Sequence, residues 1–434
     1  MRVALETLGC KVNQYESAAF LERFAEEGLQ VVPFSQRADL YVVHSCTVTN
    51  KAAYQTRQLL RRALRTNPQA RIAVVGCDAQ IHGDQLARER LATHIIGTRE
   101  KCQLHKWLLQ EGTLDAPCYA VSDARRDGPL EPLPLKGLPG DRSRAFLKIQ
   151  DGCDAFCAYC IVPFSRGRSR SLEADAAIQQ LEGFALSGCN EAVLTGIHLG
   201  QWGLDLCPKT TLAHLLMRID KARRPARIRL SSLESKEVDD DFLKVLGALS
   251  WICPHFHIPM QSGDAEILAA MGRPYGPEAY AETVLALHRL FPRAALGADV
   301  IVGFPGETDR HFAHTVRLVE ALPLTYLHVF PYSPRPGTRA ATMQGRTVGK
   351  TLKDRTRILR DVGRRKKRLF QERFVGSVLE VLVETSVEPG LWSGTSENYL
   401  TVIFQETRPT APGDLVSVRI QRVTDTGLWG TPLD

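Results

Sequence analysis

Apolar and polar residues follow one rhythm in the first part of this chain, and the rhythm changes further on. Up to about Ile96, short apolar runs of strand length are each followed by a longer stretch with the apolar spacing of a helix. These pairs predict a parallel α/β sheet, because a parallel strand reaches its neighbour through a helical crossover. The clearest pairs are Val3–Leu8 with Gln14–Glu27, Leu40–His44 with Lys51–Thr66, and Ile72–Gly76 with the stretch up to Leu91.

From Arg125 to Arg142 this rhythm is interrupted by a segment rich in proline, glycine and charged residues. Such a segment predicts a linker, because proline and glycine oppose both a regular helix and a central strand. The alternation of strand and helix then resumes for six units, which predicts a partial TIM-type (β/α)6 barrel. The expected barrel strands are Ala145–Gln150, Glu191–Thr195, Arg227–Ser231, His255–Pro259, Ala298–Val302 and Tyr326–Phe330.

The last part of the chain has a different pattern. A basic helical stretch runs from Lys353 to Arg373, and it fits a solvated helix face as well as a nucleic-acid surface. Short alternating strands bounded by glycine and proline follow, and they predict a small β-barrel or sandwich. The chain is therefore expected to be an α/β protein with residues 1–124 as N-terminal domain, 125–142 as linker, 143–372 as partial barrel and 373–434 as small β-barrel.

Composition narrows the class of protein. The 434 residues are 44% hydrophobic and 24% charged, and they contain neither a secretory signal nor an apolar run of membrane-spanning length. We therefore expect a cytoplasmic protein that does not enter a membrane. Eleven cysteines in a reducing compartment favour metal binding over disulfides. The net charge of +7 favours a polyanionic partner without identifying it as nucleic acid.

Three cysteines lie within eight residues just after the first expected barrel strand: Cys153, Cys157 and Cys160. We name them the second triad, because another set of three cysteines, described below, lies earlier in the chain. A single loop can bring three thiolates to one metal centre. Zinc takes four ligands in structural sites, whereas three cysteines leave one iron of a 4Fe–4S cluster open to a further ligand. A zinc knuckle, or three cysteines brought together by coincidence, is the competing interpretation.

The spacing of these cysteines, with the aromatic Tyr159 directly before the last, resembles the signature of the radical S-adenosylmethionine superfamily. The resemblance implies that S-adenosylmethionine binds the open iron and is cleaved, by an electron from the cluster, to methionine and a 5′-deoxyadenosyl radical. It also implies cofactor contacts at the ends of barrel strands, although each such position is equally an ordinary turn or helix cap. The expected cofactor-binding residues are Tyr159, Thr195, Gly196, Ser232, Gln261 and Gly303.

A further set of cysteines, the first triad, is spread over the N-terminal domain. Cys10, Cys46 and Cys77 each follow an expected strand, and the carboxyl ends of parallel strands meet at one edge of a sheet. The three thiols should therefore come together and form a second metal site. Coincidental burial is the alternative, since free cysteine is common in protein cores.

The sequences around the first triad, LGCKVNQYES, HSCTVTN and VGCDAQ, resemble the cysteine motifs of the methylthiotransferase family. The radical domain resembles the same family, and the last domain resembles its TRAM module, an RNA-binding β-barrel. The resemblance implies two 4Fe–4S clusters, one held by each triad. Asp78 and Gly272 depart from the family pattern, in which an aromatic residue and an asparagine are usual, but neither is an expected ligand.

Residues outside these motifs receive structural interpretations. Three barrel histidines, His255, His257 and His328, are expected to be packed and hydrogen-bonded rather than metal ligands. No residue is assigned as a general acid or base, because the implied radical step does not need one. The cysteines expected to be structural are Cys102, Cys118, Cys189, Cys207 and Cys253.

Within the family, Gly9–Gln14 and Arg166–Ser171 resemble members that act on N6-threonylcarbamoyladenosine in tRNA. This implies methylthiolation of C2 of that base, next to the anticodon, with the tRNA anticodon stem-loop as partner. Alternatives are isopentenyladenosine in tRNA, an aspartate of a ribosomal protein, or a cluster-containing RNA-binding protein that is not an enzyme. The expected RNA contacts are Arg166, Arg168, Arg170, Arg365 and Lys366.

The implied reaction uses S-adenosylmethionine twice. One molecule methylates sulfur bound at the first-triad cluster, and a second gives the radical that abstracts hydrogen from C2 of the base. A single-stranded anticodon loop lets the base leave its stack at low cost. We further expect a monomer that receives electrons from a flavodoxin or a ferredoxin, while the sulfur donor stays unassigned.

Overall fold

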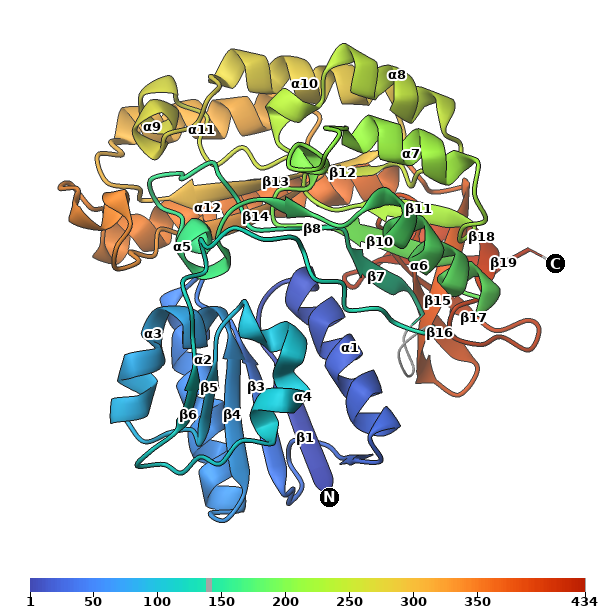
Figure 1. Ribbon diagram of the computed structural model, residues 1–434. Coiled ribbons are helices and arrows are strands. Elements are labelled where there is room, and N and C mark those ends of the chain that lie inside the picture. Colours follow the sequence, from blue (N-terminus) through green and yellow to red (C-terminus); the bar gives the residue numbers. More distant parts are fainter. Residues whose placement is uncertain (138–142, 434) are drawn as a thin grey trace. The chain divides into compact units, whose positions relative to one another are not determined.

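The computed structural model describes residues 1–137 and 143–433, and the chain folds into two compact units (Figure 1). The first unit comprises Met1–Leu135, Lys148–Glu173 and Ser333–Ala341, and the second comprises Lys136–Leu147, Ala174–Tyr332 and Thr342–Asp434. Both cysteine triads therefore belong to the first unit. Residues 138–142 of the expected linker lie outside the described residues.

A six-stranded sheet with the order β2-β1-β3-β4-β5-β6 forms the centre of the first unit. Every neighbouring pair of its strands is parallel, which confirms the parallel α/β sheet predicted from the alternation of strands and helices. The strands are β1 (Arg2–Thr7), β2 (Gln30–Val31), β3 (Leu40–Ser45), β4 (Arg71–Gly76), β5 (His94–Ile96) and β6 (Cys118–Ala120).

Helices cover both faces of this sheet. Successive side chains on a strand point to opposite faces, so Val3 packs in one apolar cluster with Phe20, whereas Ala4 packs in another with Leu60. The sheet is thus doubly wound, and the carboxyl edge of such a sheet is where ligands bind. The helices are α1 (Lys11–Glu26) and α4 (Leu104–Leu108) on one face, and α2 (Asn50–Thr66) and α3 (Cys77–Arg88) on the other. The remaining elements of this unit are η1 (Glu100–Gln103), β8 (Gln150–Asp151), α5 (Val162–Arg166) and β9 (Arg170–Ser171).

The predicted six barrel strands form two three-stranded sheets, β11-β10-β7 and β12-β13-β14. The amide of Ile228 donates to the carbonyl of Trp251 at 2.9 Å, and that of Cys253 donates to Ile228 at 2.9 Å, so the two sheets are linked at β11. This confirms the partial barrel. The strands are β7 (Ala145–Lys148), β10 (Glu191–Thr195), β11 (Arg227–Leu230), β12 (His255–His257), β13 (Ala295–Val302) and β14 (Tyr326–Pro331).

Several strand boundaries differ from the prediction, among them the end of β12 and the start of β13. Strand β13 begins at Ala295 rather than Ala298, and it contains Gly297. Glycine usually weakens a strand, but here the ring of Tyr326 takes the place of a side chain, since a Cβ on Gly297 would lie 2.0 Å from Cζ of Tyr326. The missing Cβ lets an aromatic ring from the neighbouring strand cover the backbone.

Helices of ordinary length follow the barrel strands, as expected for βα units. Among the described residues, no helix combines the length and the hydropathy needed to cross a membrane. The helices are α6 (Ala174–Leu186), η2 (Leu199–Gln201), α7 (Leu212–Asp220), η3 (Ser235–Glu237), α8 (Asp240–Ala248), α9 (Ala265–Met271), α10 (Pro277–Leu290), α11 (Asp309–Ala321), η4 (Arg339–Thr342) and α12 (Gly349–Glu372).

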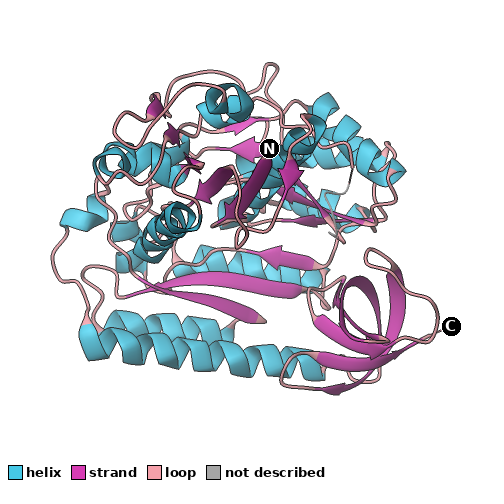
Figure 2. Ribbon diagram, turned by 90° about the horizontal axis from the view of Figure 1, so that it is seen from below, coloured by secondary structure: helices cyan, strands magenta, loops and turns pink. Residues whose placement is uncertain are grey.

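The C-terminal strands close into a barrel with the order β15-β16-β17-β19-β18, as predicted (Figure 2). Its core is apolar and includes Val381 and Phe404, and it is extended by Phe370 and Phe374 at the end of α12. The small barrel is therefore packed onto the helix that precedes it. The strands are β15 (Val378–Glu388), β16 (Leu391–Ser396), β17 (Thr401–Gln405), β18 (Leu415–Val423) and β19 (Leu428–Pro432).

A buried carboxylate joins the small barrel to the strands of the partial barrel. Glu191 accepts hydrogen bonds from Arg227 at 2.7 Å and Arg229 at 3.1 Å. The same arginines donate to the carbonyl oxygens of Thr395 and Glu397, both at 3.0 Å. Burial raises the pKa of Glu191, but the surrounding arginines outweigh burial and lower that pKa to about 2. The carboxylate is therefore charged at neutral pH.

Candidate metal centres

The register of two strands brings Cys46 and Cys77 to the same edge of the sheet. Ser45 on β3 is the register partner of Gly76 on β4, so the next residue on each strand leaves the sheet at the same level. Ser45 also ties the two loops, because its hydroxyl donates to the carbonyl of Val75 at 2.7 Å. The strand-end argument from the sequence therefore holds for these two thiols.

Cys10 reaches the same place through a close backbone approach. Gly9 has a φ of +101°, and a Cβ there would lie 2.9 Å from the sulfur of Cys46, so only glycine fits between the two loops. Asn13 holds the arrangement from the other side, since its amide nitrogen donates to the carbonyls of Leu8 at 2.7 Å and Ser45 at 3.1 Å. The structure thus brings the three cysteines of the first triad together.

Two thiols of the first triad are withdrawn from water. Cys46 is 7% exposed and Cys77 is 5% exposed, whereas Cys10 is exposed. Burial raises the pKa of the Cys46 thiol to about 12 and also raises that of Cys77. Without a metal these thiols stay protonated at neutral pH, and a metal that binds them must displace the protons. Three converging thiols at the edge of a sheet are the donor set of an iron–sulfur centre.

The loop of the second triad begins with a glycine that the backbone requires. Gly152 has a φ of +76°, and a Cβ there would lie 1.9 Å from the carbonyl oxygen of Arg168. The next residue, Cys153, donates its backbone N–H to the carbonyl of Gly167 at 3.0 Å. Its sulfur accepts the backbone N–H of Ala155 at 3.4 Å. The loop is therefore fastened at its first cysteine before it turns.

The other two cysteines of this triad lie in a tight turn. The backbone N–H of Cys160 donates to the carbonyl of Cys157 at 2.9 Å, and Phe156 takes a left-handed φ of 46°. Cys157 is 9% exposed, while Cys160 and the expected cofactor contact Tyr159 are half-buried. This triad is therefore local in sequence and more open to solvent than the two inner thiols of the first triad.

A network of buried charges lies in the same unit as both triads. Lys148 contacts Glu16 at 2.6 Å and Asp151 at 3.4 Å, Lys101 contacts Glu16 at 2.7 Å, and Arg166 contacts Asp151 at 2.8 Å. None of these five side chains is more than 3% exposed. Burial raises the pKa of Glu16, but Lys101, Lys148 and Arg166 outweigh it and hold that pKa well below its usual value. Glu16 follows the first cysteine of one triad, and Asp151 precedes the first cysteine of the other.

The three arginines after the second triad have three different environments. Arg166 is 2% exposed and donates to Asp151 and to the side chain of Asn13, so it cannot contact a phosphate as we expected. One partner of Arg166, Asn13, lies 153 residues away in the sequence. Arg168 is 67% exposed. Arg170 is half-buried and lines a cavity of about 290 Å³ together with Arg99 and other residues of both signs of charge.

The two expected RNA contacts on α12 also differ from each other. Lys366 donates to the carbonyl oxygens of Glu320 at 3.0 Å and Leu322 at 2.8 Å, and burial lowers its pKa. It therefore binds carbonyls at the end of α11 with two of its three N–H donors, and the side chain stays half-exposed. Arg365 is 58% exposed and pairs with the side chain of Glu320 at 2.7 Å.

The other expected cofactor contacts lie in the second unit, at the carboxyl ends of barrel strands. Their places are Thr195 and Gly196 at the end of β10, Ser232 after β11, Gln261 after β12 and Gly303 after β13. Gln261 has a φ of 65°, and its N–H donates to the carbonyl of Asp299 at 2.8 Å, which keeps the chain beyond β12 against β13. Their placement is that of a ligand-binding strand end, and their contact with a cofactor stays a prediction.

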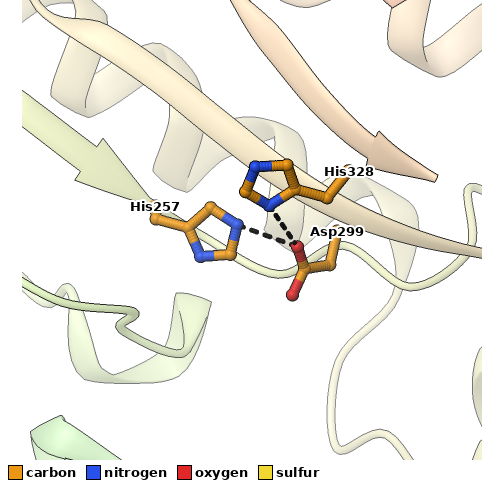
Figure 3. Close-up of side chains that lie close together, drawn as sticks. All are labelled: His257, Asp299 and His328. Atoms are coloured by element: carbon orange, nitrogen blue, oxygen red, sulfur yellow. Dashed lines mark hydrogen bonds and ion pairs between the residues drawn. The ribbon is translucent and has the colours of Figure 1, made fainter. Parts of the chain in front are cut away.

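Three side chains on β12, β13 and β14 meet around one carboxylate oxygen (Figure 3). Oδ1 of Asp299 lies 3.0 Å from Nε2 of His257 and 3.1 Å from Nδ1 of His328, and Nδ1 of His257 lies 2.7 Å from the hydroxyl of Ser232. This confirms that the histidines are hydrogen-bonded; the shared carboxylate was not expected. Burial raises the pKa of Asp299, and the two imidazoles outweigh it and hold it well below its usual value. Two imidazoles and a carboxylate are also a donor set that transition metals accept.

Comparison with known proteins adds three family matches. The description "Uncharacterized protein family UPF0004" matches residues 2–97, the radical SAM superfamily matches residues 147–319, and the TRAM domain matches residues 372–433. The chain is 36% identical over 423 residues to the threonylcarbamoyladenosine tRNA methylthiotransferase MtaB of Bacillus subtilis, covering 96% of this chain and 93% of that protein.

Other relatives and one solved structure extend this comparison. The MtaB protein of Thermotoga maritima is 34% identical, covering 98% of this chain and 96% of that protein. A tRNA-2-methylthio-N(6)-dimethylallyladenosine synthase of Erythrobacter litoralis is 31% identical, covering 99% and 97%. The radical S-adenosylmethionine methyltransferase TsrM of Kitasatospora setae shares the fold, with a TM-score of 0.55 and 16% identity over 76% of this chain and 72% of that chain.

Proposed function

This chain belongs to the methylthiotransferase family of radical S-adenosylmethionine enzymes, and we propose that it transfers a methylthio group to C2 of N6-threonylcarbamoyladenosine next to the anticodon of tRNA. The single observation that carries the proposal is the presence of two separate triads of thiols in one compact unit. A binding protein has no need of two metal centres that each leave an iron open. The relatives named for threonylcarbamoyladenosine are 33% to 36% identical, and those named for dimethylallyladenosine are 31% identical.

We propose that each triad holds a 4Fe–4S cluster. The donor chemistry fits, because each place offers three cysteines and cysteine thiolates are the ligands of such clusters. When bound, the second-triad cluster and S-adenosylmethionine supply a carbon-centred radical for hydrogen abstraction, and the first-triad cluster supplies the methylthio sulfur. The protein's part is to fix both cysteine loops, through Gly9 and Asn13 in one case and Gly152 in the other, and to keep water from the inner thiols.

The cofactor contacts remain proposals argued from the place of each residue in its own unit. Tyr159 adjoins the last cysteine of the second triad, and the other five stand at the ends of barrel strands, where TIM-type barrels bind their ligands. Among them Gln261, at 9% exposed, is the non-glycine residue held in a left-handed conformation. A buried residue held in this way costs free energy, which points to a positional requirement.

For tRNA binding we propose Arg168, Arg170, Arg365 and Lys366. Arg166 is not included, because it is 2% exposed and its guanidinium donates to Asp151 and Asn13. The C-terminal barrel adds Arg422, which is exposed. Its guanidinium lies 5.3 Å from the ring centre of Trp429. Arginine and an aromatic ring on a barrel surface suit the phosphates and bases of single-stranded RNA. We also propose a monomeric, cytoplasmic enzyme that is reduced by a flavodoxin or a ferredoxin.

Nucleoside mass spectrometry of tRNA tests this function. Cells without this protein should lose the methylthio group on threonylcarbamoyladenosine and regain it with the wild-type gene but not with Cys157→Ala. Loss of methylthio-isopentenyladenosine instead would establish the alternative base. Unchanged tRNA would contradict any tRNA substrate and direct the search to ribosomal proteins.

A further inference from the structure

Two buried arginines near the first triad carry more positive charge than their neighbours neutralise. The network around Arg166 holds three cations but only two carboxylates, Glu16 and Asp151. Arg335, from the segment Ser333–Ala341, is 2% exposed. Among the described residues no carboxylate oxygen lies within 4.0 Å of its guanidinium, and its Nε has no hydrogen-bond partner. Because an unpaired buried charge is costly, these arginines need an anion nearby.

Both guanidiniums bind side chains that stand beside first-triad cysteines. Arg335 donates Nη2 to the hydroxyl of Thr47 at 2.6 Å, directly after Cys46, and Nη1 to the side chain of Asn50. Arg166 donates to the side chain of Asn13, three residues after Cys10. Two loops of the first triad are thus held by hydrogen bonds from Arg335 and Arg166, and both arginines lie far from those loops in the sequence.

The segment that carries Arg335 also contacts the loop of the second triad. The hydroxyl of Ser333 accepts the N–H of Asn50 at 3.2 Å, and the N–H of Ala340 donates to the carbonyl of Ala158, between Cys157 and Cys160, at 2.8 Å. A short stretch of backbone therefore fastens one cysteine loop of each triad. A shift of this stretch would move both loops.

Asp78 and Cys46 are the acidic groups whose charge acts on the Arg335 guanidinium. Asp78 is already paired with Arg57 at 3.3 Å, so it does not neutralise Arg335 alone. The other negative charge that acts on both arginines is that of the first-triad cysteines and of the cluster that they would bind.

We propose that Arg335, with Arg166 as its counterpart, is a positioning residue of the first triad that braces the Cys46 loop and balances the negative charge of the cluster bound there. The proposal rests on the proposed function only in that the first triad holds a cluster. A cluster with three thiolate ligands is anionic, and reduction adds one more negative charge. A buried cation beside it stabilises the reduced form, and charge near a cluster is one of the factors that set its potential.

The test is the midpoint potential of the first-triad cluster, measured by an EPR-monitored redox titration. The full-length chain carries alanine at Cys153, Cys157 and Cys160, so that only the first triad loads. Arg335→Gln should shift the midpoint potential to more negative values, whereas Arg335→Lys, which keeps the charge, should leave it near that of the parent. Arg168→Gln is the matched control, because it removes the charge of an exposed arginine and should not move the potential.

An Arg335→Gln protein that binds iron like the parent and keeps its potential would overturn the proposal. If that variant does not fold, as judged by circular dichroism, Arg335→Met removes the same charge with an apolar side chain: a shift to more negative values supports the proposal, and an unchanged potential contradicts it. No tRNA enters this measurement. A failed tRNA assay with a normal shift in potential would therefore contradict the proposed function and leave this inference standing.

Discussion

The two triads bring three cysteines together in different ways. The second triad comes from one loop of eight residues, whose turn is closed by a hydrogen bond between Cys160 and Cys157. The first triad takes one cysteine from the end of each of three strands and exists only when the sheet is in register. A local loop keeps its ligands close in any state of the chain, whereas the first triad is a product of the whole fold.

Burial differs between the triads in degree. In the first triad Cys46 and Cys77 are buried and Cys10 is exposed, and charged side chains nearby are buried too; in the second triad Cys157 is 9% exposed and Cys153 and Cys160 are half-buried. Charges in a buried site must be paired and hydrogen-bonded, since each buried charge without a partner costs several kcal/mol of stability. The first triad should therefore depend on distant residues, and the second should depend on its own loop.

The largest effects should separate the two triads by reaction step. Cys157→Ala should abolish cleavage of S-adenosylmethionine and all methylthiolation, because it removes a ligand of the proposed radical cluster. Cys46→Ala should keep cleavage to 5′-deoxyadenosine but lose methylthiolation. Chromatography of 5′-deoxyadenosine and mass spectrometry of the tRNA measure the two steps. Loss of cleavage in Cys46→Ala would show that the triads do not have separate roles.

Alkylation of the metal-free chain should sharpen the comparison at the level of single thiols. The pKa of Cys46 is raised to about 12, from an ordinary value of 9.0, so at pH 8 its thiolate fraction is lower by roughly a thousandfold. Its reaction with iodoacetamide should be slower than that of the exposed Cys207, and it should accelerate as the pH rises towards 12. Peptide mass spectrometry gives both rates. Equal rates at pH 8 would mean that the first triad opens readily in the absence of metal.

How much of the candidate site could be predicted from the sequence depends on how far apart in the chain the interacting residues lie. The spacing of Cys153, Cys157 and Cys160 is local, and strand ends sufficed to bring Cys46 and Cys77 to one edge of the sheet. Three alternate arginines after the second triad look alike in sequence, but a partner far away, Asn13 for Arg166, decides which one is buried. Local spacing carries no information about that partner.

One missed residue left a signal and another left none. Lys148 is a charged residue between apolar residues of a predicted strand, and a charge at such a position is rarely buried without a partner. Its partners Glu16 and Asp151 were thus predictable in kind, though not by name. Arg335 lies between two prolines in a loop, where nothing in the pattern distinguishes a buried arginine from an exposed one.

Removing one partner of the buried network should weaken the first triad more than the second. Glu16→Gln leaves Lys101 and Lys148 without their shared carboxylate and should cost about 3–5 kcal/mol in the free energy of unfolding. Since the folded pKa of Glu16 is lowered, the wild-type contribution is present above pH 4.5 and is lost as the pH falls through the folded value. Urea denaturation followed by fluorescence measures the change.

The control for this variant is Glu27→Gln, which removes an exposed ion pair with Arg23 at the end of the same helix and should cost about 0.5 kcal/mol or less. Iron analysis after mild dialysis adds a second readout: Glu16→Gln should lose iron from the first triad first. Equal stability of the two variants would show that the buried network does not support this triad.

The smallest effect separates the exposed arginine from the buried one beside the second triad. Arg168→Gln should weaken tRNA binding only a few-fold and reduce the slope of log affinity against log salt by about 1, because one phosphate contact is lost. The iron content and the fold should stay as in the wild type. Arg166→Gln should do the reverse, since that guanidinium holds Asp151 and Asn13 and has no path to solvent. Filter binding at several salt concentrations distinguishes the two, and an unchanged salt slope in Arg168→Gln would remove this arginine from the RNA surface.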